Sequence, residues 1–214
     1  MKYLSMLLVF LLLLSGSAFA QQEDGGIRTL FKKSDKDKKI HVGWYIGPEG
    51  AWTRFKQKDV FLGGISFGVT LDHFFSVGLA GSGILNPGNL WYDDVWEKNG
   101  AYLAGGYGGV RMEFTLFPKY PVHLSFPLLI GGGGLTYLHR YYYDWNYYYD
   151  VTSLDWDAFF VVEPGIRVEL NVVKFMRIYA GAAYRYTPDL DLINTPADLI
   201  NNFNAVFGLK FGKF

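Results

Sequence analysis

Apolar and polar side chains alternate strictly along the second half of the chain. Between residues 158 and 171 the even positions are almost all apolar, whereas the odd positions include Glu163, Arg167 and Glu169. A period of two over ten or more residues is typical of a strand. Read along the whole chain, this pattern predicts eight strands, at 40–55, 60–71, 74–85, 101–116, 122–138, 158–171, 176–186 and 201–212.

The connectors between these predicted strands differ in length. Three are short, at 72–73, 117–121 and 172–175, and three are long, at 86–100, 139–157 and 187–200, while the first link, 56–59, is short and breaks the alternation. Short periplasmic turns and long outer loops are typical of outer-membrane barrels, whose bulky apolar faces contact lipid. We therefore predict an all-β fold, an eight-stranded antiparallel transmembrane β-barrel. A soluble sandwich or lipocalin-like barrel shows the same alternation and is the alternative.

Four proline and glycine positions interrupt the predicted strands or their ends. Pro48, Pro127 and Pro164 each lack a ladder donor, so each predicts a bulge or a bend. Near the C-terminus, Phe207, Leu209 and Phe211 share one face and Phe214 falls out of phase, which predicts a bulge at Gly212.

Composition narrows the classes of function. The 214 residues carry 20 Lys and Arg and 20 Asp and Glu, so the chain lacks the basic surplus of a nucleic-acid binder. The absence of Cys excludes a disulfide scaffold, a Cys-ligated zinc site and a thiol enzyme. His41 and His139 are too far apart in the sequence to build a metal site. We expect no cofactor and no metal.

The first twenty residues have the pattern of a secretory signal. Lys2 precedes an apolar run from Leu4 to Leu14, and Ala18-Phe19-Ala20 forms a small-residue exit. The apolar run is shorter than the roughly 20 residues of a spanning helix. We predict a signal peptide at 1–20 that is cleaved after Ala20, a flexible periplasmic tail at 21–39 and a barrel at 40–214.

The region 40–214 resembles the small eight-stranded outer-membrane barrels of Gram-negative bacteria, the OmpA/OmpX/OmpW-like group. The resemblance rests on the barrel pattern, on segments such as 122–131 and 163–171, and on the terminal apolar residues Phe207, Leu209, Phe211 and Phe214. It implies an outer-membrane location, contact with lipid and lipopolysaccharide, and recognition of the terminal residues by the barrel-assembly machinery. The group includes adhesins, small-solute channels and lipid enzymes, so it implies no single activity.

Nine charged side chains fall on the polar faces of the predicted strands. They are Glu49, Arg111, Glu113, Glu163, Arg167, Glu169, Arg177, Arg185 and Lys210. Because buried charges must be paired, we interpret them as a salt-bridge network in a closed lumen, with Arg177 opposite the region of Glu169. The alternative is a narrow, porin-like channel for small solutes.

Two further patterns suggest surface or chemical roles. The segment 139–157 is rich in aromatic residues, which form either a girdle and hairpin or a binding site for an extracellular protein or glycan. They are Tyr141, Tyr142, Tyr143, Trp145, Tyr147, Tyr148 and Tyr149. The outer loops also carry an acidic excess that divalent cations would bridge to lipopolysaccharide phosphates.

His123 and Ser125 share one strand face and would suit a lipid esterase if a carboxylate oriented the His. They also read as polar residues beside a turn, and we expect no enzyme. The paired carboxylates at 155 and 157 and at 189 and 191 are too few for a calcium site, which needs six or more oxygen ligands.

Overall fold

The computed structural model describes residues 40–96, 99–142, 149–188 and 190–214. Its long elements are strands, and its one short 3-10 turn is η1 (Pro87–Asn89). The strands are β1 (Val42–Phe55), β2 (Lys58–Leu71), β3 (Phe75–Ile84), β4 (Trp91–Trp96), β5 (Asn99–Leu116), β6 (Val122–Tyr142), β7 (Tyr149–Val173), β8 (Met176–Arg185) and β9 (Asn202–Lys213).

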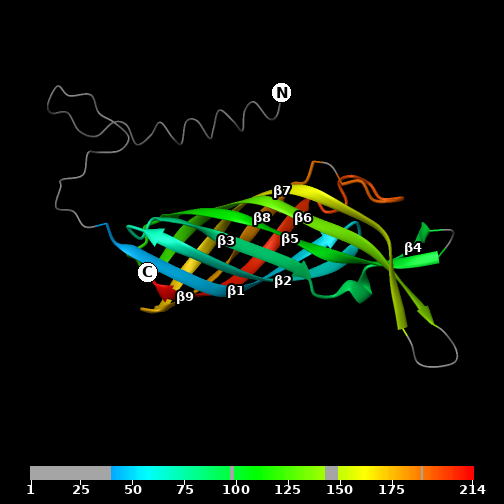
Figure 1. Cartoon of the computed structure of the whole chain (residues 1–214). Coiled ribbons are helices and arrows are strands. Elements are labelled where there is room, and N and C mark those ends of the chain that lie inside the picture. The colour runs from blue at the N-terminus through cyan, green and yellow to red at the C-terminus, as the bar shows by residue number, and fades with distance from the viewer. Residues whose placement is uncertain (1–39, 97–98, 143–148, 189) are drawn as a thin grey trace, which may run out of the picture. The chain divides into compact units, whose positions relative to one another are not determined.

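Eight of these strands close into an antiparallel ring. Each barrel strand pairs with its neighbour in sequence, β1 pairs with β9, and β3 pairs with β5 across the position of β4. The ring therefore has no open edge, and Figure 1 shows its strands wrapped around one interior. The predicted eight-stranded antiparallel barrel is confirmed.

The two faces of the barrel wall carry different side chains. On β7 the outward Phe160 is 51% exposed and Ile166 is 47% exposed, whereas the inward Arg167 and Glu169 are buried. The same belt of exposed Phe, Ile, Leu and Val side chains runs over the other strands. A soluble barrel would turn these apolar faces inward and its charges toward water, so the wall is built for lipid contact.

The segments predicted as connectors contain strands that the sequence analysis did not predict. β4 lies within the predicted link 86–100 and pairs with β5 beyond the ring. β6 continues to Tyr142 and β7 begins at Tyr149, so the described part of the predicted loop 139–157 is largely a hairpin. This stretch is rich in Tyr, Val and Thr, which favour strands whether or not they alternate with polar residues. The hairpin and β4 extend past the other strands (Figure 1).

The predicted bulges at proline and glycine are wrong. Pro48, Pro127 and Pro164 keep the same register as the residues around them, and so does Gly212 opposite Tyr45. Each proline lies instead beside a gap in the pairing to one neighbouring strand. A proline removes a donor without adding a residue, so the ladder loses a bond and keeps its register. The register shifts lie elsewhere: on β7 opposite Tyr137 and Leu138, at the end of the pairing between β7 and β8, and between Tyr92 and Trp96 in the pairing of β4 with β5.

Candidate functional site

The interior of the barrel is the candidate site, and its two ends are distinct. We call the end where β1 begins and β9 ends the terminal end; it also holds the short turns between β2 and β3, β5 and β6, and β7 and β8. The opposite end, with β4, the hairpin of β6 and β7 and the segment 186–201, is the loop end (Figure 1).

A network of buried ions fills the terminal half. Arg111 of β5 binds Glu49 of β1 through two nitrogen–oxygen contacts of 2.5 and 2.8 Å. The guanidinium of Arg167 on β7 lies 3.9 Å from Glu49 and 3.6 Å from Glu113. These ion pairs thereby connect β1, β5 and β7, no two of which are adjacent in the ring, across the lumen. Such a two-contact geometry is the strongest form of the Arg–carboxylate pair.

The network continues toward the terminal end through β9. The ammonium of Lys210 contacts Glu113 and lies 2.5 Å from Glu169, and Nη1 of Arg177 lies 3.8 Å from Glu169. Directly across the strand pair, Arg177 faces Asn171 and Glu169 faces Tyr179. Arg177 thus lies near Glu169, as the turn at 172–175 suggests, but the two residues are diagonal neighbours rather than a directly opposed pair. Lys210 makes the shorter contact with Glu169.

Aromatic side chains separate and support these ions. The Tyr179 hydroxyl donates to Glu49 at 3.0 Å, and the Arg167 guanidinium lies 4.5 Å from the Tyr179 ring centroid. Gly208 makes room for this ring, because a Cβ there would lie 2.4 Å from the Tyr179 oxygen. The glycines among the charged positions therefore serve packing inside the narrow barrel.

Two of the predicted lumen charges have other partners. Glu163 accepts hydrogen bonds from Tyr107 at 2.6 Å and from Asn204 at 2.8 Å. Arg185 donates from Nε to the Ile200 carbonyl at 2.9 Å. Both side chains are buried, and they mark the border between the charged half and the rest of the interior.

His123 and Ser125 are brought together with a carboxylate. The Ser125 hydroxyl donates to Glu169 at 2.9 Å, and Nε2 of His123 lies 3.2 Å from the other oxygen of Glu169. In a catalytic arrangement, the Ser hydroxyl would donate a hydrogen bond to one ring nitrogen of the His, and a carboxylate would accept one from the other ring nitrogen. Here both residues hold the same carboxylate and are buried, so they are part of the ion network.

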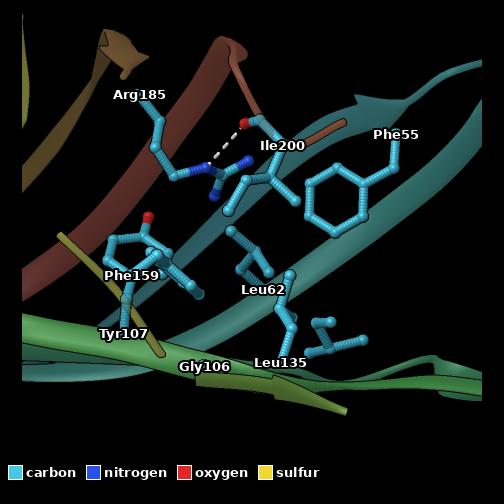
Figure 2. A pocket seen from close by; sticks show the side chains of 9 residues that line it. Phe55, Leu62, Gly106, Tyr107, Leu135, Phe159, Arg185 and Ile200 are labelled. Carbon is cyan, nitrogen blue, oxygen red and sulfur yellow. Dashed lines mark hydrogen bonds between the residues drawn. The ribbon is translucent and has the colours of Figure 1, made fainter. Parts of the chain in front are cut away.

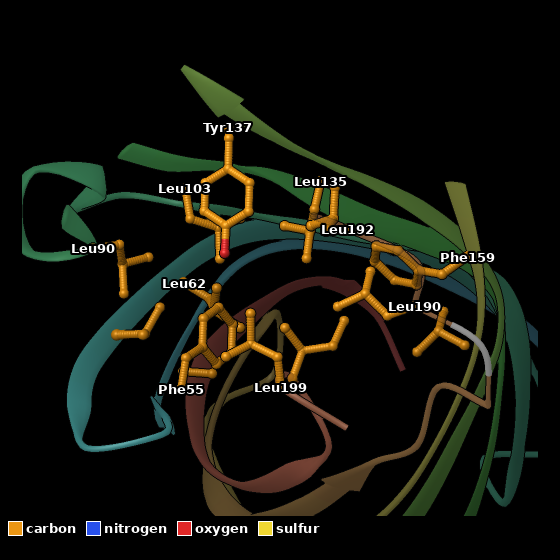
Figure 3. Packing of buried hydrophobic residues seen from close by; sticks show 14 of the residues in the cluster. Phe55, Leu62, Leu90, Leu103, Leu135, Tyr137, Phe159, Leu190, Leu192 and Leu199 are labelled. Atoms are coloured by element: carbon orange, nitrogen blue, oxygen red, sulfur yellow. The ribbon is translucent and has the colours of Figure 1, made fainter. Parts of the chain in front are cut away.

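The loop half of the interior is apolar, which the sequence reading of a polar lumen did not predict. Wall residues such as Phe55, Leu62 and Leu135 point inward there. The segment between β8 and β9 folds into the mouth and adds four apolar side chains, and Figure 3 shows its leucines among those of the wall. These four are Leu190, Leu192, Leu199 and Ile200. The signal in the sequence was four apolar side chains in a connector expected to lie in water.

Hydrogen bonds hold this mouth segment in place. Asn201 accepts from the Thr187 backbone and hydroxyl at 2.7 and 2.6 Å, which closes the neck of the segment. Asp157 accepts from the Asp191 amide and Asp155 from the Ile193 amide, both at 2.7 Å. The two carboxylates thus bind backbone donors of the segment.

Among the described residues, one cavity found in the loop half is small. A cavity of about 10 Å³ lies between wall residues, Arg185 and Ile200, and Figure 2 shows the hydrogen bond between those two residues above it. Such a volume is about the space of one water molecule.

Aromatic side chains gather beyond the ring at the loop end. The Trp91 and Tyr102 rings lie 4.7 Å apart, and Lys58 lies 4.6 Å from the Tyr92 ring centroid. Burial, and secondarily nearby Tyr137, raise the pKa of Tyr92 to about 12, so its phenol stays neutral at ordinary pH. Of the predicted aromatic site, Tyr141, Tyr142 and Tyr149 lie on strands, but the positions of the seven side chains lie outside the described residues.

The residues of the predicted assembly signal lie on the outer face of β9 and just beyond its end. Phe207 is exposed on the outer face, where Leu209 and Phe211 are partly covered. The Phe214 ring lies at the terminal end, with the guanidinium carbon of Arg177 3.8 Å from its centroid.

Two searches of the described residues are negative. No group of three or more His, Cys, Asp or Glu side chains in this part of the chain could hold a metal ion. Within the same ranges, no helix is long and apolar enough to cross a membrane.

Comparisons with known proteins show the fold. No family model and no curated protein matches the sequence. Among solved structures, the chain is similar to Neisserial surface protein A, with a TM-score of 0.52 and 10% identity over 83% of this chain and 100% of that one. A second match is Ail of Yersinia pestis in complex with the heparin analogue sucrose octasulfate, with a TM-score of 0.42 and 11% identity over 80% and 97% of the two chains. The chain has the fold of small eight-stranded outer-membrane barrels.

Proposed function

We propose that the protein is a non-enzymatic outer-membrane barrel with a closed interior, whose loop end faces outward and interacts with partners at the cell surface. The observation that carries the proposal is the exposed apolar belt around an interior filled by ions at one end and by leucines at the other. A wall of this kind is stable only in lipid.

The closed interior distinguishes the proposed function from that of a solute channel. The ions of the terminal half are paired and buried, and the cavity in the loop half holds about 10 Å³. A solute path needs continuous polar space, which this packing opposes. We expect no steady conductance when the refolded protein is inserted into planar bilayers. Steady single-channel steps would support the porin-like alternative and overturn the closed interior.

The orientation can be tested directly because the chain has no Cys. Gln57→Cys places a thiol at the exposed turn between β1 and β2, and Lys174→Cys places one at the exposed turn between β7 and β8. A membrane-impermeant maleimide should label position 57 in intact cells and position 174 only after permeabilisation. The reverse pattern would contradict the proposed orientation, and labelling of both positions only after permeabilisation would contradict the outer-membrane location.

The arrangement around Glu169 supports a non-enzymatic role. Ser125 and His123 both bind this carboxylate and are buried, so neither presents a reactive atom to a lipid. Ser125→Ala should therefore leave the lipid composition of the expressing cell unchanged. A change in lipid acylation that depends on Ser125 would favour the lipid-enzyme alternative.

Surface interaction is supported by the extension beyond the ring. β4 carries Trp91 there and β5 carries Tyr102, and Trp156 is 70% exposed on β7. Exposed aromatic rings favour recognition of proteins and glycans. Replacing the seven aromatic residues of 141–149 by Ser should reduce binding of purified barrel to lipopolysaccharide-coated beads or to host-cell extracellular matrix. Unchanged binding to both would contradict a role of the hairpin in surface interaction.

The last residues of β9 are proposed as the signal for the assembly machinery. Phe207 and Phe211 lie on the outer face, which a membrane-embedded partner can reach. Phe211→Ser should lower the amount of folded protein in the outer membrane without changing refolding in detergent. An equal loss in both assays would show a role in stability alone.

A further inference from the structure

A cavity of about 600 Å³ opens at the terminal end of the barrel, beside the Arg177 end of the ion network. It lies between the turn after β5, the turn between β7 and β8, and the last residues of β9. Its lining includes Lys174, Arg177 and Lys213 together with Asn171 and Phe214. No acidic side chain is among its lining residues, all of which lie in the described part of the chain.

Arg177 is the buried member of this lining. Its side chain is about 5% exposed as a residue, and its Nε has no hydrogen-bond partner among the described residues. Its ion pair with Glu169 uses Nη1 at 3.8 Å, which is long for a charged hydrogen bond. A buried guanidinium with an unused donor is costly unless an acceptor satisfies it.

The ion network leaves a positive charge at this position. Its three carboxylates are shared among four cations, even with His123 neutral. Two of those carboxylates, Glu113 and Glu169, already contact Lys210. Arg177 stands at the open end of the chain of contacts, where an external anion can balance it.

Further charged groups lie near the cavity. His73 lies in the neighbouring turn between β2 and β3. Burial lowers the pKa of His73, the charges of His41, Lys119 and Arg177 lower it further, and the carboxylate of Asp72 opposes this shift. Lys174 and Lys213 are exposed and extend the positive region to the membrane surface.

We propose that this cavity is a phosphate site, in which the guanidinium of Arg177 and the ammonium groups of Lys174 and Lys213 supply the positive charge. A phosphate suits three cations around an open cavity, because it carries more than one acceptor for an Arg fork and for point charges of Lys. Its source is either the headgroup of an anionic phospholipid in the adjacent leaflet or a soluble phosphate. Only the choice of leaflet rests on the proposed orientation.

The test uses the full chain refolded in a zwitterionic detergent. Titration with inorganic phosphate, followed by calorimetry and by the Arg177 Nε–H resonance, should show saturable binding that shifts this resonance. The pair Lys174→Gln and Lys213→Gln should weaken binding by roughly tenfold or more, because the phosphate loses two charged contacts. Both residues are exposed and lie outside the ion network, so the fold should be unaffected. Lys56→Gln at the exposed loop end is the matched control and should bind as the parent does.

A second arm distinguishes the sources. Vesicles of phosphatidylcholine with and without phosphatidylglycerol replace the detergent, and the same resonance is followed. A shift with phosphatidylglycerol, or with inorganic phosphate, supports the site and identifies its source. If neither probe moves the Arg177 resonance, or if the double variant equals the parent, the proposal is overturned. It is also overturned if phosphate binds only after Phe214 is deleted, because the chain's own terminal carboxylate would then be the occupant. The thiol-labelling pattern tests the orientation independently of these results.

Discussion

Toward the terminal end the barrel is filled by buried charges, whereas toward the loop end it is filled by leucines and aromatic rings. In the charged half each residue depends on a few specific partners, as Glu169 does on Lys210, Ser125 and His123. In the apolar half each side chain contacts many neighbours without direction. In the charged half, a single substitution should therefore lower stability strongly, and a second substitution in the partner should offset part of that loss. In the apolar half, stability should fall in proportion to the side-chain volume removed.

The largest effect is expected in the charged half. Glu169→Gln leaves Lys210 and Arg177 short of a carboxylate in a buried site, which should lower the free energy of unfolding by about 3–5 kcal/mol. Urea unfolding in lipid vesicles, followed by tryptophan fluorescence, measures this loss. The double change Glu169→Gln with Lys210→Met should be milder than the single change. A double variant that is less stable than the single one would contradict the dependence on partners.

In the apolar half, Leu103→Ala should cost about 3 kcal/mol, because Leu103 is fully buried in the rigid wall. Leu192→Ala removes the same atoms from the mouth segment and should cost less, since a connector relaxes into the space more easily than a strand does. The same urea unfolding assay compares the two. Equal losses would show that the mouth segment is as rigid as the wall.

A smaller and local effect is expected where the mouth segment is tied to β7. Asp157→Ala removes the acceptor of the Asp191 amide and should weaken that attachment by about 1 kcal/mol. Faster hydrogen exchange at Asp191 and Ile193, with little change in global unfolding, is the expected result. Asp198→Ala, an exposed carboxylate in the same segment, is the control and should leave exchange at those amides unchanged.

The smallest effect is expected at the surface. Arg54 and Asp59 form an exposed ion pair at 2.8 Å between β1 and β2. Water screens such pairs, so Arg54→Gln should change the free energy of unfolding by less than about 0.5 kcal/mol. The same urea experiment serves as the measurement. A loss approaching that of Glu169→Gln would mean that burial is not the source of the contrast between ion pairs.

Much of the fold could be read from the alternation along single strands. In 158–171 and 176–186, odd and even positions separate the inward Arg167, Glu169 and Arg177 from the outward apolar residues. Successive side chains of a strand point to opposite faces, so this separation can be read from the sequence. The extension of β6 and β7 was missed, since a run of tyrosines carries no alternation. The predicted bulges failed because a missing donor does not by itself change the register.

The site was less accessible to the sequence. That Glu169 would be shared by His123 and Ser125 required the pairing of β6 with β7, and that it would meet Lys210 required β9 on the far side of β8. The apolar filling at the loop end required a connector to fold back into the mouth. Nothing in the spacing of Leu190 and Leu192 says whether they cover an interior or lie in water.

The sequence by itself determined that the chain forms strands with one apolar and one mixed face, because a period of two is a local property of the backbone. It also determined that charged side chains share the mixed face with glycines. Only the tertiary structure decided which ions meet, that the charges gather at one end, and that Arg177 is left at an open cavity. The physical reason is that these contacts join strands far apart in the chain, whose relative register is set by closure of the whole ring.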